Sequence, residues 1–464
     1  MKNIFKMFNK NTNNDNADKE ESHVGDAEAD NFVYGVEDTF KLRDSNDLIV
    51  VGHVRGTVKQ GMAVYVSNIG DDDGGVVLTE VISMEKLGKM VTAATDTPVG
   101  IRLSNCSSSG VKIGSVIHTR ETSTKDVHTA YTFALNETYI KLKNLELTDE
   151  EISKMSITDC AESWNLFNKN QHSMLQGASD IEVQVYRSKI DFLANHLINK
   201  ILDAQEIYTV FNKRTGEPHL FSNTIKQNDG NYLCTPPDIL IVSKAYSKIY
   251  EQYYPKELFE IKVIKNGDQK DGIYNFFGSS FYLNGACGVA VNSPKTAINA
   301  EMIVPKPDYG DTPEIQIPIS NPDLVRWMIL MGQVGKPQSQ DEQLIYNLYY
   351  RFMSFALMEA KLLVPMKKDG NKIPSMTADN VLKEDIKISI PMTKGKDKKD
   401  SVPLFTDWKR LRMSYDEEWD AMIQPISGLI NTFDCSINPT EYSAAGCYIT
   451  EETFAQMKKM FEGK

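Results

Sequence analysis

The spacing of apolar residues changes twice along this chain, and those changes restrict the folds open to it more than any other feature. Residues 32 to about 120 hold short β-branched runs such as LIVVGHV and GVVLTEVI, separated by Gly, Asp, Asn and Ser. Such runs are typical of a small all-β barrel. The spacing then becomes helical to about 205, and strands alternate with helices after 206. The sequence predicts a multidomain protein: a small all-β barrel, a helical linker and two mixed α/β (α+β) units.

We place segment boundaries where composition and spacing change. The segments are a disordered tail at 1–31, the β-barrel at 32–122, a helical linker at 123–185, a first α/β unit at 186–339 and a second at 340–464. The tail is rich in Asn, Asp, Glu and Lys, with few large apolar residues after Phe8. It is therefore expected to bury too little surface to offset the entropy of ordering.

Composition narrows the environment and the partners. A net charge of −12 argues against a general nucleic-acid binder, and no DNA partner is expected. The sequence holds no run of about 18 apolar residues and no secretory signal pattern, so we expect a cytoplasmic protein without membrane contact. The six cysteines are dispersed without a C-x-x-C pair, which favours reduced thiols over a zinc site or a disulfide framework.

Several local signals predict turns and helix starts. Gly56 and Gly61 are expected to bracket a turn between paired strands, and DDDGG at 71–75 is expected to be a hairpin loop. Two capping boxes are expected to begin helices; they are Thr148 with Glu151, and Ser414 with Glu417 before EEWDAMIQPISGLI. The segment NPDLVRWMILMGQV is expected to begin with an Asn cap followed by Pro at the first helical position.

The two α/β units look alike in the order of their elements, which suggests a diverged internal repeat. HLFSNT corresponds to PLFTDW, and GVAVNSP corresponds to CSINPTE. In the second pair, Asn292 and Asn438 end strands at equivalent points. An Asn at that place can hold a turn through its side chain, and the alternative is that both residues line a shared ligand groove.

The segment Val36 to Ile117 resembles domain II of elongation factor Tu and its relatives, through VEDTFKL, VVGHVRGTVKQGMAVYV, TDTPVGIRL and IGSVIHT. The GTPase domain of that family would come before the barrel, and no G-x-x-x-x-G-K-[ST] motif occurs, so no GTPase activity is expected. The resemblance places Glu37, Asp38 and Phe40 where the family helps to form a pocket for an aminoacyl end. It implies RNA or tRNA binding through the barrel; alternatively, the three residues only shape the first strand.

The segment from about 345 to 464 resembles the enhanced serine sensitivity protein B (SseB) family, through ALMEAKLLVPM, VPLFTDWKRL, GLINTFDCSINP and ITEETFAQM. The region near 185 to 305 looks like a distant copy of the same module. The resemblance implies a cytoplasmic bacterial α/β domain with no established catalytic residues. Phe405 and Trp408 follow Pro403 as an aromatic step, which is either buried or an exposed anchor for a protein partner.

No motif assigns a reaction to the chain. None of the seven His residues has metal-ligand spacing and no G-x-S-x-G elbow occurs, so no catalytic residue, metal or cofactor is predicted. The leading hypothesis is a non-enzymatic binding or regulatory protein that docks a protein partner. The alternatives are a translation-associated factor that binds a tRNA end or ribosomal site through the barrel, and an enzyme with an unrecognised site in the α/β units.

Overall fold

The structure is a computed structural model of the whole chain. It describes residues 31–462 except 44, 70–75, 107–109, 136–147, 229–231, 294–295, 314–315, 369–387, 395–398 and 441–444. The expected N-terminal tail, apart from Asn31, and the expected hairpin loop at 71–75 lie outside the described residues. Within them, no helix is both long and apolar enough to cross a membrane.

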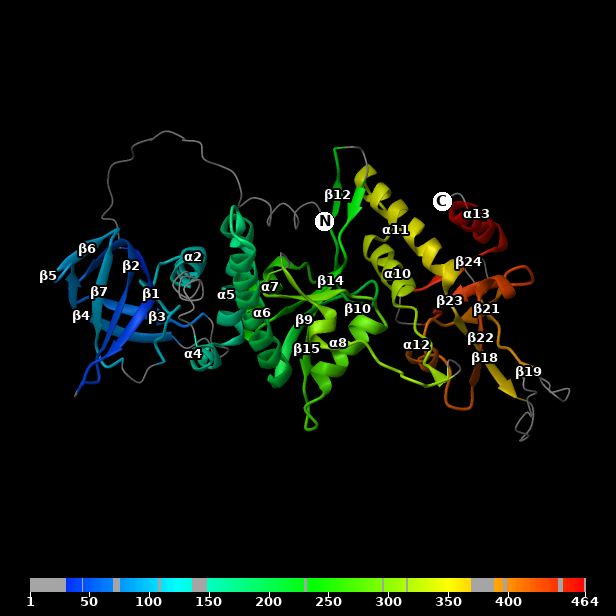
Figure 1. Cartoon of the computed structure of the whole chain (residues 1–464), viewed down its shortest axis with the longest axis horizontal. Coiled ribbons are helices and arrows are strands. Elements are labelled where there is room, and N and C mark those ends of the chain that lie inside the picture. The colour runs from blue at the N-terminus through cyan, green and yellow to red at the C-terminus, as the bar shows by residue number, and fades with distance from the viewer. Residues whose placement is uncertain are drawn as a thin grey trace. The chain divides into compact units, whose positions relative to one another are not determined.

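The chain divides into two compact units, and each is described by itself. Unit 1 comprises Met1–Ile201 and Ser243–Tyr254, and unit 2 comprises Leu202–Val242 and Pro255–Lys464. The chain thus leaves unit 2 once, forms a single helix within unit 1, and returns. Unit 1 holds the barrel and most of the helices of the first half, and unit 2 holds the α/β sheets (Figure 1).

Unit 1 begins with a closed antiparallel barrel, which confirms the expected all-β domain. Its six strands hydrogen-bond in the order β1-β8-β3-β4-β7-β2, and pairing of β1 with β2 closes the ring. Two short strands extend it, with β5 paired to β4 and β6 to β2. The bounds are β1 Phe32–Lys41, β2 Leu48–Lys59, β3 Ala63–Ser67, β4 Val76–Lys86, β5 Lys89–Val91, β6 Ala93–Thr95, β7 Pro98–Leu103 and β8 Val116–His118.

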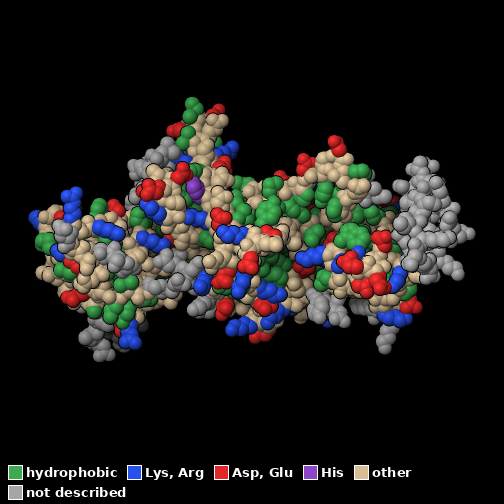
Figure 2. Space-filling view, turned by 90° about the horizontal axis from the view of Figure 1, so that it is seen from below, with side chains coloured by type: hydrophobic (Ala, Val, Ile, Leu, Met, Phe, Trp, Pro, Cys, Tyr) green, Lys and Arg blue, Asp and Glu red, His purple; other side chains and the backbone are tan. Residues whose placement is uncertain are grey.

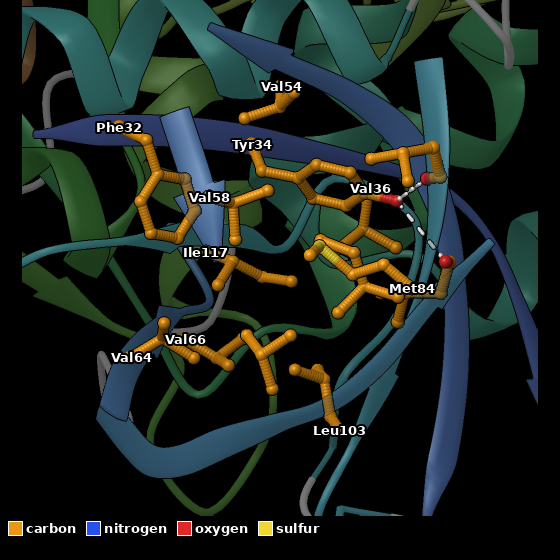
Figure 3. Packing of buried hydrophobic residues seen from close by; sticks show 14 of the residues in the cluster. Phe32, Tyr34, Val36, Val54, Val58, Val64, Val66, Met84, Leu103 and Ile117 are labelled. Carbon is orange, nitrogen blue, oxygen red and sulfur yellow. Dashed lines mark hydrogen bonds between the residues drawn. The ribbon is translucent and has the colours of Figure 1, made fainter. Parts of the chain in front are cut away.

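The interior of the barrel is apolar, with one polar group at its centre. Alternate residues of the strands point inward, as the period of two in a strand requires. Tyr34 is fully buried among them, and its hydroxyl lies 2.8 Å from the Val99 carbonyl oxygen and 3.2 Å from that of Val50 (Figure 3). The hydroxyl is therefore satisfied inside the core, and burial raises the pKa of Tyr34.

The prediction that Gly56 begins a turn is wrong, whereas Gly61 does lie at a turn. Strand β2 runs without a break through Gly56, and the chain turns only at residues 60–61. At Gly56 φ is +82°, and its N–H donates to the Asp96 carboxylate at 2.8 Å. Beyond this residue β2 pairs with β6 in place of β1 and β7. The glycine thus bends a continuous strand at the point where it changes partner.

A helix lies directly on the outer surface of the barrel. The contact between α2 and β1 is close, because a Cβ atom at Gly35 would lie 2.6 Å from the Ala130 carbonyl oxygen. The capping box of Thr148 with Glu151 is confirmed at the start of α4. The helices of this half are α2 Thr124–Ala134, α4 Asp149–Lys154, α5 Ile157–Leu175, α6 Asp180–Asp203 and α7 Lys244–Tyr253.

Unit 2 contains two α/β segments in succession. The first has β9 Glu206–Asn212, β10 Glu217–Pro218, β11 Leu220–Phe221, the separate hairpin of β12 Thr224–Lys226 and β13 Tyr232–Cys234, β14 Asp238–Val242, β15 Phe259–Lys265, α8 Gly272–Tyr282, β16 Gly288–Val291, β17 Ala297–Asn299 and α9 Ala300–Ile303. The second has α10 Pro322–Val334, α11 Gln340–Glu359, β18 Leu362–Lys368, β19 Ile388–Ser389, β20 Thr393–Lys394, β21 Asp400–Leu404, α12 Trp408–Arg412, β22 Asp420–Gln424, the 3₁₀ turn η2 Ile426–Gly428, β23 Asp434–Ile437, β24 Cys447–Ile449 and α13 Glu451–Glu462.

Strand pairing follows the same order in both segments. The first strand pairs antiparallel with a later one, β9 with β15 and β18 with β22. A central parallel pair follows, β14 with β16 and β21 with β23, and each pair ends in an antiparallel partner, β17 or β24. The expected correspondence of HLFSNT with PLFTDW is wrong, because β21 takes the place of β14 and not of β11. GVAVNSP and CSINPTE do contain the equivalent strands β16 and β23.

Two helix-start expectations differ from the structure. After Ser414 and Glu417 the chain forms strand β22 instead of a helix, because five residues there pair with β18 and their backbone groups join that ladder. Asn321 occupies the cap position of α10 but its side chain does not cap the helix. Its amide instead donates to the carbonyl oxygens of Lys361 and Thr406, at 2.8 and 2.7 Å.

Candidate binding sites

Glu37 projects from a bulge in the first barrel strand. The register of β1 against β2 shifts between Val36 and Asp38, so Glu37 is the extra residue. Its carboxylate lies 2.6 Å from Nδ1 of His53 on β2. The His53 ring meets the Phe133 ring of α2 edge to face at 5.4 Å, and the Arg55 guanidinium also lies 5.4 Å from that ring. Glu37 therefore belongs to a partly exposed charged and aromatic group formed by two strands and a helix.

Among the described residues, no hydrogen bond, ion pair or ring contact joins the other two barrel candidates to this group. The Asp38 carboxylate accepts a hydrogen bond from the Thr39 N–H at 2.8 Å, which is a local backbone contact. Phe40 lies near the end of β1 with 52% of its surface exposed. The structure thus leaves Phe40 available for contact and gives Asp38 a role in shaping the strand.

Asn292 and Asn438 occupy matching, buried places. Both have positive φ, +57° and +49°, and each backbone N–H donates to the preceding parallel strand, at the carbonyl oxygens of Ile241 and Leu404. The Asn438 amide oxygen accepts from the Thr406 N–H at 3.0 Å, and its nitrogen donates to the Ala445 carbonyl oxygen at 3.0 Å. These contacts give Asn438 a turn-holding role and leave its side chain facing the protein interior.

Phe405 and Trp408 lie in and beside a small apolar core. Phe405 is fully buried with Leu363 and Leu411, and it meets Tyr415 edge to face at 5.7 Å. Trp408 is half-buried against the same cluster, with the Arg412 guanidinium 5.1 Å from its ring. The exposed-anchor alternative therefore does not fit Phe405. This residue directly follows β21, its backbone bridges Leu363 of β18, and its side chain is fully buried.

Sequence reasoning missed a buried ionic cluster in unit 2, which we call the Arg410 cluster (Glu217, Asn284, Asp407 and Arg410). Arg410 is 2% exposed, and its two terminal nitrogens reach Asp407 at 2.7 Å, Glu217 at 2.9 Å and Asn284 at 2.8 Å. The Asn284 amide in turn donates to Glu217 at 3.0 Å. Asp407 is the N-cap of α12 and lies three residues before Arg410. It is the one partner of Arg410 that sequence spacing could have indicated.

Unit 1 holds a second buried polar cluster where α2, α5 and α7 meet. We call it the Glu162 cluster (Lys112, His128, Tyr131, Asp159, Glu162, Tyr246 and Tyr250). Asp159 on α5 is ion-paired with Lys112 at 2.9 Å and accepts a hydrogen bond from the Tyr131 hydroxyl at 2.9 Å. The Tyr246 hydroxyl of α7 lies 2.8 Å from Nε2 of His128 on α2 and is hydrogen-bonded to Glu162. Burial is the main cause of two pKa shifts here. It raises the pKa of Glu162 to about 7 and lowers the pKa of His128.

The β12–β13 hairpin of unit 2 presents apolar side chains to solvent. Ile225 and Leu233 are direct cross-strand partners, so they share one face, and they are 51% and 49% exposed. The next pair, Thr224 and Cys234, points to the opposite face, where both side chains lie beside the phenol of Tyr349 on α11. One face of the hairpin thus packs against α11. The other face is apolar and exposed to solvent.

Among the described residues, no three His, Cys, Asp or Glu side chains are placed together so that they could hold a metal ion. The features that remain as candidates for function are the Glu37 group, the open face of the hairpin and the two buried clusters.

Comparison with protein families gives a match over residues 351–442 to the SseB protein N-terminal domain. Two solved structures of translation elongation factor SelB from Methanococcus maripaludis are similar to part of the chain, the apo form at 20% identity and the complex with the GTP analogue GppNHp at 19%. They cover 21% and 22% of this chain, each match spans 21% of the SelB chain, and the TM-score is 0.18 for both. Comparison with curated proteins finds no match. Residues 351–442 therefore carry an SseB protein N-terminal domain.

Proposed function

We propose that this chain is a non-enzymatic binding protein that docks a protein partner through the open face of the β12–β13 hairpin. The observation that carries the proposal is the pair Ile225 and Leu233, half exposed on a two-stranded sheet that hydrogen-bonds to no other described strand. The partner is expected to present an apolar segment in extended conformation. Such a segment can cover this pair and add a strand to a free edge of the hairpin.

The physics of an isolated hairpin supports this role. Two strands alone are marginally stable in water, and unpaired edges with exposed apolar residues favour association with other chains. Here the contact with Tyr349 holds one face against α11, so the hairpin can keep its shape while the other face stays open. A preformed apolar face lowers the entropy lost when a partner binds.

The surface charge favours a protein over RNA as the partner. On the face drawn in Figure 2, Lys and Arg side chains are mixed with Asp and Glu side chains over the described residues. Phosphate backbones are held by concentrated positive charge, which produces a steep dependence of affinity on salt. The net charge of −12 points the same way. The Glu37 group still provides the place to test tRNA-end or ribosomal binding as the second candidate.

We also propose that the first α/β segment of unit 2 is a second module of SseB type. Its support is the shared order of strand pairing, together with Asn292 and Asn438 at the ends of equivalent strands with the same backbone bond. In the sequence, a helix also follows the first strand of each parallel pair, α7 after β14 and α12 after β21, although α7 belongs to unit 1. On this proposal the hairpin is an addition to the first module, placed between its strands β9 and β14.

The test is a quantitative pull-down of the full chain from its native cytoplasm. The wild type is compared with the double variant Ile225→Asp/Leu233→Asp, which places two charges on the open face. Met413→Asp is the matched control, because Met413 is 49% exposed in unit 2 and lies outside the hairpin. We expect one protein to be recovered with the wild type and the control at similar levels, and at least tenfold less with the double variant.

Two results would count against the proposal. Equal recovery of the same protein by wild type and double variant would remove the hairpin from the interface. Recovery of tRNA or ribosomal components that is lost at high salt, and lost in Glu37→Ala, would instead favour binding through the barrel. Circular dichroism of every variant shows whether a loss of binding reflects loss of folding.

A further inference from the structure

Helix α7 belongs to unit 1, although the strands on either side of it in the sequence, β14 and β15, belong to unit 2. Whatever controls the packing of α7 therefore acts on a segment that is covalently tied to both units. We propose that the packing of α7 against α2 and α5 is a pH-sensitive switch, in which protonation of the buried Glu162 carboxyl holds the helix and ionisation loosens it.

The contacts that seat α7 form a short hydrogen-bonded chain. Tyr246 of α7 is 4% exposed, and its hydroxyl contacts both His128 of α2 and Glu162 of α5. Ser243, the N-cap residue of α7, adds a second buried contact, with its hydroxyl 2.5 Å from that of Thr158 on α5. The contacts that hold α7 against α2 and α5 are therefore polar. They include groups whose hydrogen bonding changes with protonation.

The groups that face Glu162 leave its negative charge uncompensated. They are the phenol of Tyr131 from α2, the carboxylate of Asp159 from α5, and the phenols of Tyr246 and Tyr250 from α7. The nearby cation, Lys112, is paired with Asp159, and among the described residues no cation is ion-paired with Glu162. His128 reaches Glu162 only through the Tyr246 hydroxyl, and burial disfavours the charged form of His128 by lowering its pKa. Burial raises the pKa of all three phenols, so they also stay neutral.

The direction of the effect follows from the raised pKa of Glu162. Burial raises it from 4.5 to about 7, the Asp159 charge adds to the rise, and the Tyr246 hydrogen bond opposes it. A carboxyl with a raised pKa in the packed state favours that state while it is protonated, and the gain is lost as pH rises through the raised value. The packing of α7 against α2 and α5 is therefore more stable at pH 6 than at pH 8.

The test is hydrogen exchange of residues 244–253 in the full chain, corrected for the intrinsic effect of pH on exchange. Between pH 6 and pH 8 we expect protection of these amides in the wild type to fall about tenfold, the change given by one titration with its midpoint at pH 7. Amides of barrel strand β2 serve as the internal control and are expected to show no such change.

Two variants make the outcome decisive. Glu162→Gln keeps the shape of the side chain without its charge, and we expect α7 protection that does not change with pH. Tyr246→Phe removes a hydrogen bond to the carboxylate, and the midpoint is expected to move to higher pH, so this variant tests the proposal even if Glu162→Gln folds poorly. The proposal is overturned if wild-type protection is the same at both pH values, if Glu162→Gln shows the wild-type change, or if Tyr246→Phe leaves the midpoint in place.

Discussion

The Arg410 cluster of unit 2 and the Glu162 cluster of unit 1 bury similar chemistry in different electrostatic surroundings. In unit 2 a guanidinium that is 2% exposed lies among two carboxylates and an amide and contacts all three. In unit 1 the buried Glu162 carboxyl faces a second carboxylate and three phenols, and the local ammonium group is paired elsewhere. The first cluster carries its own counter-charge, and the second leaves one carboxyl without any.

The difference shows that burial alone does not fix the behaviour of a polar cluster. A charge that is matched inside the protein makes the packing depend on its counter-ion. An unmatched carboxyl takes up a proton instead, so that the packing depends on pH. The Arg410 cluster is therefore expected to join the two segments of unit 2 through its charge pairs. The Glu162 cluster is expected to hold the helices of unit 1 together with a strength that depends on pH.

The largest effect is expected for Arg410→Met. Removing the cation leaves Asp407 and Glu217 with buried charge that nothing compensates, and breaking a buried pair in this way costs about 3–5 kcal/mol. Urea unfolding followed by tryptophan fluorescence measures the loss, because Trp327, Trp408 and Trp419 lie in unit 2. Arg410→Lys is the control; it keeps the charge without the forked geometry and is expected to cost less. A loss below about 1 kcal/mol for Arg410→Met would remove the claim that this cluster joins the segments.

A smaller effect is expected from pH on unit 1. Because Glu162 binds its proton more tightly when folded, unit 1 is expected to lose roughly 1.4 kcal/mol of stability between pH 6 and pH 8. Urea unfolding with pulsed hydrogen exchange, read on peptides of α5, reports this unit separately. Glu162→Gln is expected to abolish the difference. Stability that rises over this interval would show that another group dominates the titration.

The smallest effect is expected for Lys112→Met. Its ammonium group compensates Asp159, but the Lys112 side chain is 31% exposed, so solvent screens the pair and the expected cost is about 1 kcal/mol. Asp159 keeps its hydrogen bond from Tyr131. The same pulsed exchange at pH 8 measures the loss. A cost as large as that of Arg410→Met would mean that the two clusters do not differ in the way described.

Much of the fold could be predicted from local patterns. The strand runs between 32 and 118 and the capping box at Thr148 are both present, because each is specified by residues close together in the sequence. The sequence predicts a helix after Ser414, but pairing with β18 decides the conformation there, and those partners are more than fifty residues away. The sequence predicts a turn at Gly56, but a strand can change its partner there without ending.

The sites were harder to predict, because burial and long-range contacts decide them. The sequence could show that Asn292 and Asn438 follow similar strands, but not that Asn438 turns its amide toward Thr406 and Ala445. Phe405 lies in the core because of its strand partner, which local composition does not reveal. The contacts of Arg410 with Glu217 and Asn284 span 193 and 126 positions, a separation at which one sequence carries no signal.

Photocrosslinking in the cell shows whether the open face of the hairpin contacts a protein partner. The side chain of Ile225 is replaced by a benzophenone amino acid, and Met413 is replaced in the same way in a second protein. We predict a discrete protein adduct from position 225 that does not form from position 413. Adducts with RNA, equal adducts from both positions, or no adduct from position 225 in a folded protein would show that this face does not bind a protein partner.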